Sequence, residues 1–193
     1  MIEALTTQRY PHTTVLLDGR SVRIRPLTPA DRETLGRFYE AMPTEDLVYM
    51  DRNLRSPEVL QEWLDATDRH ELLDLAAESE SGEIVGHCLV YHTPRGWKSH
   101  QGRIRITVLP AWRHKALASR LIQEMVHVAL NAGLDLLVAE FIPGQETAME
   151  TFSRNSFHTL ARIPQYVRDV QGKDHDLVLM GRNLRDQEFF AAD

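Results

Sequence analysis

The sequence predicts a single domain of the α+β class (mixed α/β), built on one mostly antiparallel sheet. Strand-like and helix-like segments follow one another along the 193 residues, and no long linker or internal repeat divides them. Hydrophobic residues make up 42% and charged residues 26% of the chain, close to the averages of globular domains. The formal charge of −6 disfavours a nucleic-acid binder that tracks phosphates, so no nucleic-acid partner is expected.

The chain begins with a predicted hairpin followed by two helices. Thr13 to Leu17 and Ser21 to Arg25 are strand-like, and Asp18-Gly19 between them is a favoured dipeptide of tight turns. Thr28-Pro29-Ala30-Asp31 supplies an N-cap, a proline at the first helical position and an acid, which predicts a helix start. Ser56-Pro57-Glu58 predicts the start of the second helix, which carries an apolar face at helical spacing.

An antiparallel meander and a long helix come next. Leu72 to Ser79, Glu83 to Thr93 and Gly102 to Leu109 read as its strands. Pro110 lacks an N–H and cannot continue the ladder, so the third strand must lose its pairing there. A helix is expected from Arg113 to Ala132.

The last third of the chain completes the sheet. Leu134 to Ile142 is a nearly continuous apolar run typical of a central strand. A short helix is expected over Glu146 to Ser156, and closing strands over Phe157 to Arg168 and Asp174 to Arg182.

Cysteine usage and the lack of targeting signals indicate the compartment. Cys88 is the only cysteine, which excludes an internal disulfide and a thiolate-based metal centre, and no metal is expected. The start of the chain has no signal-peptide pattern, and no apolar run approaches the roughly 20 residues that span a bilayer. We therefore expect a soluble, cytoplasmic protein without a membrane partner.

The most informative segment runs from Val108 to Ser119, where a strand end meets a helix start. A helix N-terminus presents unpaired N–H groups and a partial positive charge, which attract a phosphate. Arg113, His114 and Lys115 place cations there against the macrodipole, and an anionic ligand would offset that cost. The alternative is a plain solvated first turn.

These residues resemble the acyl-CoA motif of the GNAT superfamily of N-acetyltransferases, Val-x-Pro-x-x-(Arg/Gln)-x-x-Gly-x-(Gly/Ala). Val108, Pro110, Arg113 and Ala118 match that motif. The resemblance extends over most of the chain. It includes the segments Arg23 to Asp31, Gly82 to Gly86 and, on the helix that lies over the pantetheine arm, Ala148, Phe152 and Phe157. Leu17-Asp18-Gly19-Arg20 and Leu137 to Glu140 are similar to the branch related to bacterial protein acetyltransferases.

The resemblance implies a GNAT-like fold whose sheet splays at the acyl-CoA site. It also implies transfer of an acetyl group from acetyl-CoA, the co-substrate, to a primary amine on a small molecule or a protein lysine, by direct attack. The N–H of Leu109, freed where the strand splays, would polarise the thioester carbonyl. The implied cofactor-binding residues are Val108, Leu109, Arg113, His114, Lys115, Ala116, Leu117, Ala118, Ser119, Gln145 and Phe152.

Several positions depart from the family pattern. Ala116 replaces the first motif glycine, which costs on the order of 1 kcal/mol if its φ is positive and nothing if it is helical. Phe152 stands where many members have a tyrosine that protonates the thiolate, and Ser156 replaces a glycine. Gln145 replaces an asparagine, and Arg103 stands where the protein-acetyltransferase branch often has a glutamate base.

A general base must then come from elsewhere, because the acceptor amine has a pKa near 10. Glu140 is the candidate, as a carboxylate within an otherwise apolar strand. The alternative for Glu140 is an ion pair with Arg103 or Arg105 across the sheet. We expect the helices of residues 30 to 66 and the loop Pro94 to Gln101 to form the wall of the acceptor pocket.

The segments outside the core lead to two further interpretations. We expect a hairpin segment over residues 1–20, the GNAT-like domain over 21–184 and a tail over 185–193. Phe189-Phe190 in that tail favours packing against a second subunit in a homodimer. The family's usual residues are replaced at Ala116, Phe152 and Arg103. An alternative interpretation is therefore a non-catalytic module that binds acyl-CoA or a protein partner.

Overall fold

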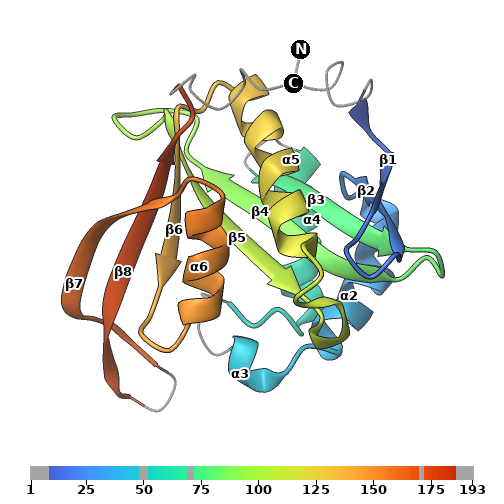
Figure 1. Cartoon of the computed structure of the whole chain (residues 1–193), viewed down its shortest axis with the longest axis horizontal. Helices are drawn as coiled ribbons and strands as arrows, with labels where there is room; N and C mark the ends of the chain where they lie inside the picture. Colours follow the sequence, from blue (N-terminus) through green and yellow to red (C-terminus); the bar gives the residue numbers. More distant parts are fainter. Residues whose placement is uncertain (1–8, 48–51, 69–71, 170–171, 186–193) are drawn as a thin grey trace.

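The computed structural model describes residues 9–47, 52–68, 72–169 and 172–185. It contains one eight-stranded sheet in the order β1-β2-β3-β4-β5-β6-β8-β7, with helices on both faces (Figure 1). The strands are β1 (His12–Val15), β2 (Ser21–Arg25), β3 (Leu72–Ser79), β4 (Ile84–His92), β5 (Gln101–Val108), β6 (Leu136–Phe141), β7 (His158–Arg168) and β8 (Asp174–Asn183). The helices are η1 (Pro29–Asp31), α2 (Arg32–Glu40), α3 (Thr44–Leu47), α4 (Pro57–Asp68), η2 (Pro110–Trp112), α5 (Leu117–Asn131) and α6 (Glu146–Arg154). The predicted α+β class with a mostly antiparallel sheet is confirmed.

The start of the first helix forms as its sequence predicts. The Asp31 carboxylate accepts hydrogen bonds from the Thr28 N–H at 2.8 Å and from the Thr28 hydroxyl at 2.9 Å. Arg25 at the end of β2 pairs with the same carboxylate at 2.6 Å and with Glu78 of β3 at 2.7 Å. These contacts fix the start of α2 on the sheet, because its N-cap Asp31 is bonded to Arg25 of β2, which in turn pairs with Glu78 of β3.

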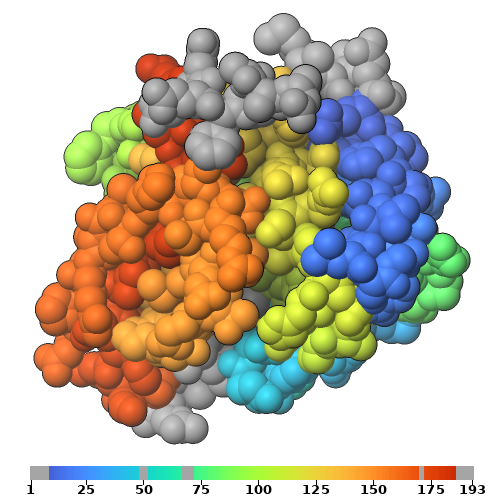
Figure 2. Space-filling view, viewed as in Figure 1, coloured from blue at the N-terminus to red at the C-terminus, as the bar shows by residue number. Residues whose placement is uncertain are grey.

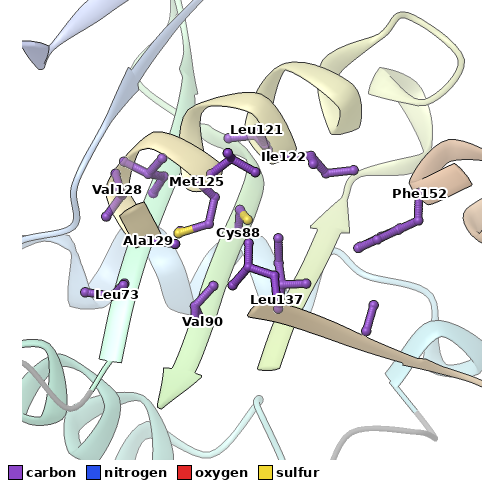
Figure 3. Packing of buried hydrophobic residues seen from close by; sticks show 14 of the residues in the cluster. Leu73, Cys88, Val90, Leu121, Ile122, Met125, Val128, Ala129, Leu137 and Phe152 are labelled. Atoms are coloured by element: carbon purple, nitrogen blue, oxygen red, sulfur yellow. The ribbon is translucent and has the colours of Figure 1, made fainter. Parts of the chain in front are cut away.

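Each face of the sheet buries a separate hydrophobic core. On one face, α5 packs Leu121, Met125 and Ala129 against strand residues that include Cys88 and Leu137 (Figure 3). On the other face, α2 and α4 pack against β3 and β4 around Phe38, Tyr39, Trp63 and Leu89. The Cys88 side chain is fully buried and burial raises the pKa of its thiol, as expected for a small core residue rather than a nucleophile.

Strands β5 and β6 diverge along the middle of the sheet. They pair in parallel over three residue pairs, from Gln101↔Leu136 to Arg103↔Val138, whereas β5 stays paired with β4 as far as Val108. Gly102 lies in this short joint, where a Cβ atom would stand 2.4 Å from Val90 and 2.8 Å from Leu134. The two strands pack closely where β5 begins and have no ladder pairs after Arg103. The sheet therefore opens toward its lower edge in Figure 1.

The structure differs from the expected elements at two places. Helix α5 begins at Leu117 rather than Arg113, because Ala116 just before it has a left-handed φ of 67°. Helix α3 was not predicted. The loop Pro94 to Gln101 leads into the start of β5, at the opposite end of that strand from Val108, and its place in the wall of the acceptor pocket stays a prediction. Phe189-Phe190 lie outside the described residues.

Among the helices of the described residues, none is long and apolar enough to cross a membrane. The same residues bring together no group of three or more His, Cys, Asp or Glu side chains arranged to bind a metal ion.

Candidate functional site

At the end of β5, one main-chain N–H group points into the gap between β5 and β6. The Leu109 N–H donates to the Val85 carbonyl at 3.0 Å, so the prediction that the strand break frees this N–H is wrong. Main-chain groups of neighbouring strand residues point to opposite sides. The N–H of Val108 therefore points away from β4 and toward β6, where the two strands have already parted.

The loop between β5 and α5 has a strained backbone. His114 and Ala116 have φ values of 58° and 67°, a region that favours glycine. Of the two conformations considered for Ala116, the structure has the costly one. Gly86 of β4, opposite Val108, lets α5 approach the sheet closely, because a Cβ there would lie 3.0 Å from Leu121 and 3.2 Å from Leu117.

The start of α5 presents amide donors. Its first helical hydrogen bond runs from the Arg120 N–H to the Ala116 carbonyl at 3.0 Å. The N–H groups of Leu117, Ala118 and Ser119 precede that bond, as helix geometry requires, and form an anion-binding end. The Arg113 N–H does not join them, because it donates to the Pro110 carbonyl at 3.2 Å.

The cationic side chains of this loop contact other parts of the protein. Arg113 donates from Nε to the Val108 carbonyl at 3.0 Å, and its Nη2 pairs with the Asp46 carboxylate of α3. Lys115 Nζ lies 3.6 Å from the Asp18 carboxylate in the β1–β2 turn, while His114 is exposed. Arg113 thus links α3 to the end of β5.

Helix α6 lies beside α5 across the diverging strands, and the two surfaces meet along a seam in Figure 2. Gln145 precedes α6, and its side-chain carbonyl accepts the Ile142 N–H at 3.0 Å, so the NH2 group of the same amide can still donate. Phe152 is buried and packs edge-on against Phe141 and Phe157, with ring centroids 5.1 and 4.9 Å apart.

A residue that the sequence analysis did not single out holds α5 and α6 together. Asn155 is 6% exposed and donates from Nδ2 to the Ser119 hydroxyl at 3.0 Å and to the Thr151 carbonyl at 2.8 Å. Ser156 beside it has a φ of 62°, at the position where the family resemblance leads us to expect glycine. The signal in the sequence was an asparagine one residue before that missing glycine.

Glu140 lies on the opposite face of the sheet from α5. Its Oε2 is 3.2 Å from Nη1 of Arg103, whose guanidinium carbon lies 5.4 Å from the ring centroid of Tyr91. The ion pair was the alternative considered for Glu140, and it forms with Arg103. The Glu140 side chain is 32% exposed, so the carboxylate lies at the open edge of the gap rather than in an apolar pocket.

A buried polar pair lies deeper on the same face. His87 of β4 is directly opposite Thr107 of β5 in the ladder, and its Nδ1 is 2.8 Å from the Tyr39 hydroxyl of α2. Burial lowers the pKa of His87 to about 3, which keeps the imidazole neutral. Its Nε2 is buried and has no hydrogen-bond partner among the residues that the structure describes. Neither residue of this pair stood out in the sequence.

Comparison with known proteins agrees with this geometry. The family model described as "Acetyltransferase (GNAT) family" matches residues 36–157. The Bacillus subtilis protein YwnH is 25% identical over 156 residues, which cover 80% of this chain and 94% of YwnH. The L-methionine sulfoximine/L-methionine sulfone acetyltransferase of Pseudomonas paraeruginosa is 29% identical over 126 residues, 64% of this chain and 72% of that protein.

A solved structure shows the same fold. The yncA structure from Salmonella typhimurium, determined with its cofactor acetyl-CoA, superposes with a TM-score of 0.74 at 18% identity and covers 86% of this chain and 96% of that one. The splayed strands, the helix that begins at the splay and the match over residues 36–157 all agree. The chain belongs to the GNAT family of acetyltransferases.

Proposed function

We propose that this protein transfers the acetyl group of acetyl-CoA to a primary amine by direct attack. The observation that carries the proposal is the parting of β5 from β6 after Arg103, beside the amide-rich start of α5. A phosphate-containing ligand gains hydrogen bonds and a favourable dipole at such a helix end.

Different residues of the site fit different parts of acetyl-CoA. The N–H groups of Ala116 to Ser119 would hold the pyrophosphate, and the amide of Gln145 would bind the pantetheine arm. The Val108 N–H, which faces the gap, takes the role first expected of Leu109 and would stabilise negative charge on the thioester oxygen. Acetyl-CoA supplies the activated acyl group, and the protein supplies these donors.

The acceptor would enter from the face that carries Glu140. We assign Glu140 as the general base that removes a proton from the ammonium, directly or through water. Cys88 is buried in the core, which supports direct attack without an acyl-cysteine intermediate.

Two features of this face favour a small acceptor that carries a carboxylate. Arg103 and Arg105 project from β5 on the side of Glu140, and arginine matches a carboxylate with two parallel hydrogen bonds. The Pseudomonas relative is named for L-methionine sulfoximine and L-methionine sulfone. We propose an amino-acid-like amine as the acceptor, in preference to a protein lysine.

The test combines binding with turnover. We expect calorimetric titration with CoA and with acetyl-CoA to give micromolar dissociation constants. We also expect CoA release with a panel that contains amino acids, the same amino acids as amides, and a lysine peptide. Release with the free amino acids and little with their amides would support the carboxylate assignment. Release with the lysine peptide alone would contradict it.

A non-catalytic acyl-CoA-binding module is the second candidate function. It is favoured by Phe152, which has no acidic hydrogen, and by Arg103 in the position where a base occurs in related branches. Micromolar acetyl-CoA binding without CoA release above background, over the whole panel, would support it. Product formation that is abolished in Glu140→Gln would exclude it.

A further inference from the structure

The turn between β1 and β2 lies against the loop that precedes α5. The Gly19 N–H donates to the Leu16 carbonyl at 3.0 Å, and the Leu16 N–H to the Arg20 carbonyl at 2.9 Å, which closes the turn Leu16–Arg20. From this turn the Leu17 N–H donates to the Lys115 carbonyl at 3.3 Å. The two segments are far apart in sequence, so the contact is a feature of the tertiary fold.

Arg20 makes a second attachment to the same loop. Its Nη2 donates to the Ala111 carbonyl at 2.9 Å, and its guanidinium carbon lies 3.7 Å from the centroid of the Trp112 ring. Asp18 orients this guanidinium by accepting from its Nε at 2.7 Å. The loop is therefore held near both of its ends, at Ala111 and at Lys115.

The Leu17 contact sets the direction of an amide donor. The C=O of Lys115 and the N–H of Ala116 belong to one planar trans peptide unit, in which the two groups point in opposite directions. Because the carbonyl is bonded to Leu17, the Ala116 N–H points away from the hairpin. In Figure 2 the yellow loop lies between the blue hairpin and the orange α6 region.

The same contacts explain how a strained loop stays in place without its motif glycine. His114 and Ala116 have positive φ, and such residues persist where surrounding structure holds them. We propose that the Leu16–Arg20 turn is a positioning element of the acyl-CoA site, which holds the loop so that its amides face the phosphates. This inference rests on the proposed function, because it concerns the binding of the same co-substrate.

The test removes one donor from the turn and leaves the rest intact. Leu17 occupies the second position of the turn closed by the Gly19-to-Leu16 hydrogen bond, where proline is favoured, so Leu17→Pro should preserve the hairpin. Leu17→Ala is the matched control, because it keeps the N–H and removes a side chain that is 82% exposed. We expect Leu17→Pro to raise the dissociation constant of CoA roughly five- to tenfold, as for one lost hydrogen bond, and Leu17→Ala to stay within about twofold.

A second pair of variants probes the other attachment. Arg20→Ala removes both the hydrogen bond to Ala111 and the stacking on Trp112, and should raise the KM of acetyl-CoA with little change in kcat or in the KM of the amine. Arg20→Lys should restore part of the loss. Wild-type-like CoA affinity in both Leu17→Pro and Arg20→Ala would overturn the inference. Absence of CoA binding by the wild type would overturn the proposed function together with it.

Discussion

Arg103 and Glu140 join β5 to β6 at the point where the hydrogen bonds between these strands end. Arg103 is in the last pair of the parallel ladder, Glu140 is two residues beyond its partner Val138, and the two charged groups lie 3.2 Å apart. The side chains are 38% and 32% exposed, so solvent screens the pair and its contribution to stability is below about 1 kcal/mol. The ion pair thus lies where the gap between β5 and β6 begins.

The first prediction separates the roles of these two residues. We expect Glu140→Gln to lower kcat/KM by about 100-fold or more, because the amide cannot accept the proton of the ammonium. Arg103→Gln keeps the Glu140 carboxylate, so its kcat should stay within about tenfold of the wild type, while the KM of a carboxylate-bearing acceptor should rise. Glu150→Gln, on the exposed face of α6, is the control for loss of a carboxylate and should be neutral. Equal losses of kcat in Glu140→Gln and Arg103→Gln would argue for a structural pair instead of a base.

The second prediction concerns the two residues at glycine positions. We expect Ala116→Gly to stabilise the protein by about 1 kcal/mol, because glycine adopts the left-handed region without a Cβ penalty. Ser156→Gly should act in the same direction. Ala118→Gly, within the first turn of α5, is the control and should destabilise by about 0.5–1 kcal/mol. Denaturant midpoints measure all three, and a destabilised Ala116→Gly variant would refute the strain argument.

The third prediction is a pH dependence of stability. His87 has a folded-state pKa of about 3 against about 6.5 when unfolded, so only the unfolded chain takes up a proton as the pH falls below 6.5. This contribution is complete above pH 6.5 and is lost progressively down to pH 3. Between pH 7 and pH 5 we expect a loss of about 2 kcal/mol in the free energy of unfolding.

The variant His87→Gln should remove that slope, whatever its stability at pH 7. His158→Gln, which replaces an exposed histidine of β7, is the control and should keep the slope of the wild type. Urea titrations at the two pH values give the comparison. A slope that survives in His87→Gln would assign the proton uptake to other groups.

The fourth prediction concerns Phe152. A thiol has a pKa near 8.5, so the departing thiolate is a weak base and water suffices to protonate it. We expect Phe152→Tyr to change kcat by less than about threefold. Its buried ring would gain a hydroxyl among Phe141 and Phe157, at a cost of about 1–3 kcal/mol if that group finds no partner. A tenfold rise in kcat would show instead that proton delivery limits the reaction.

The sequence predicted the elements well where local signals decide them. Asp18-Gly19, the Thr28 to Asp31 cap and the alternation in β5 each gave an element close to its observed bounds, because turn chemistry and periodicity act over a few residues. The left-handed φ of Ala116 was left open, because alanine itself favours the helical region and contacts with the distant Leu17 support the other conformation. The Leu109 N–H was misassigned because strand register decides which neighbour an amide faces.

In the candidate site, too, local features could be predicted from the sequence and long-range contacts could not. The strand-to-helix junction was visible as a motif, whereas the hydrogen bond of Tyr39 to His87 and that of Asn155 to Ser119 join residues 48 and 36 positions apart. The partner of Glu140 was one of two alternatives. The register of the β5–β6 ladder, if continued, would place Glu140 opposite Arg105, but the strands part after Arg103 and the ion pair forms with Arg103.

The short joint between β5 and β6 also has a mechanical consequence. Strands β1 to β5 and strands β6, β8 and β7 are two sub-sheets that share three residue pairs and one ion pair in the part of the chain that the structure describes. A ligand that spans the gap would contact both sub-sheets and make them unfold together. Amide hydrogen exchange should then slow at Ile106, Val108 and Glu140 when CoA is added, and a two-step unfolding profile should merge into one cooperative transition.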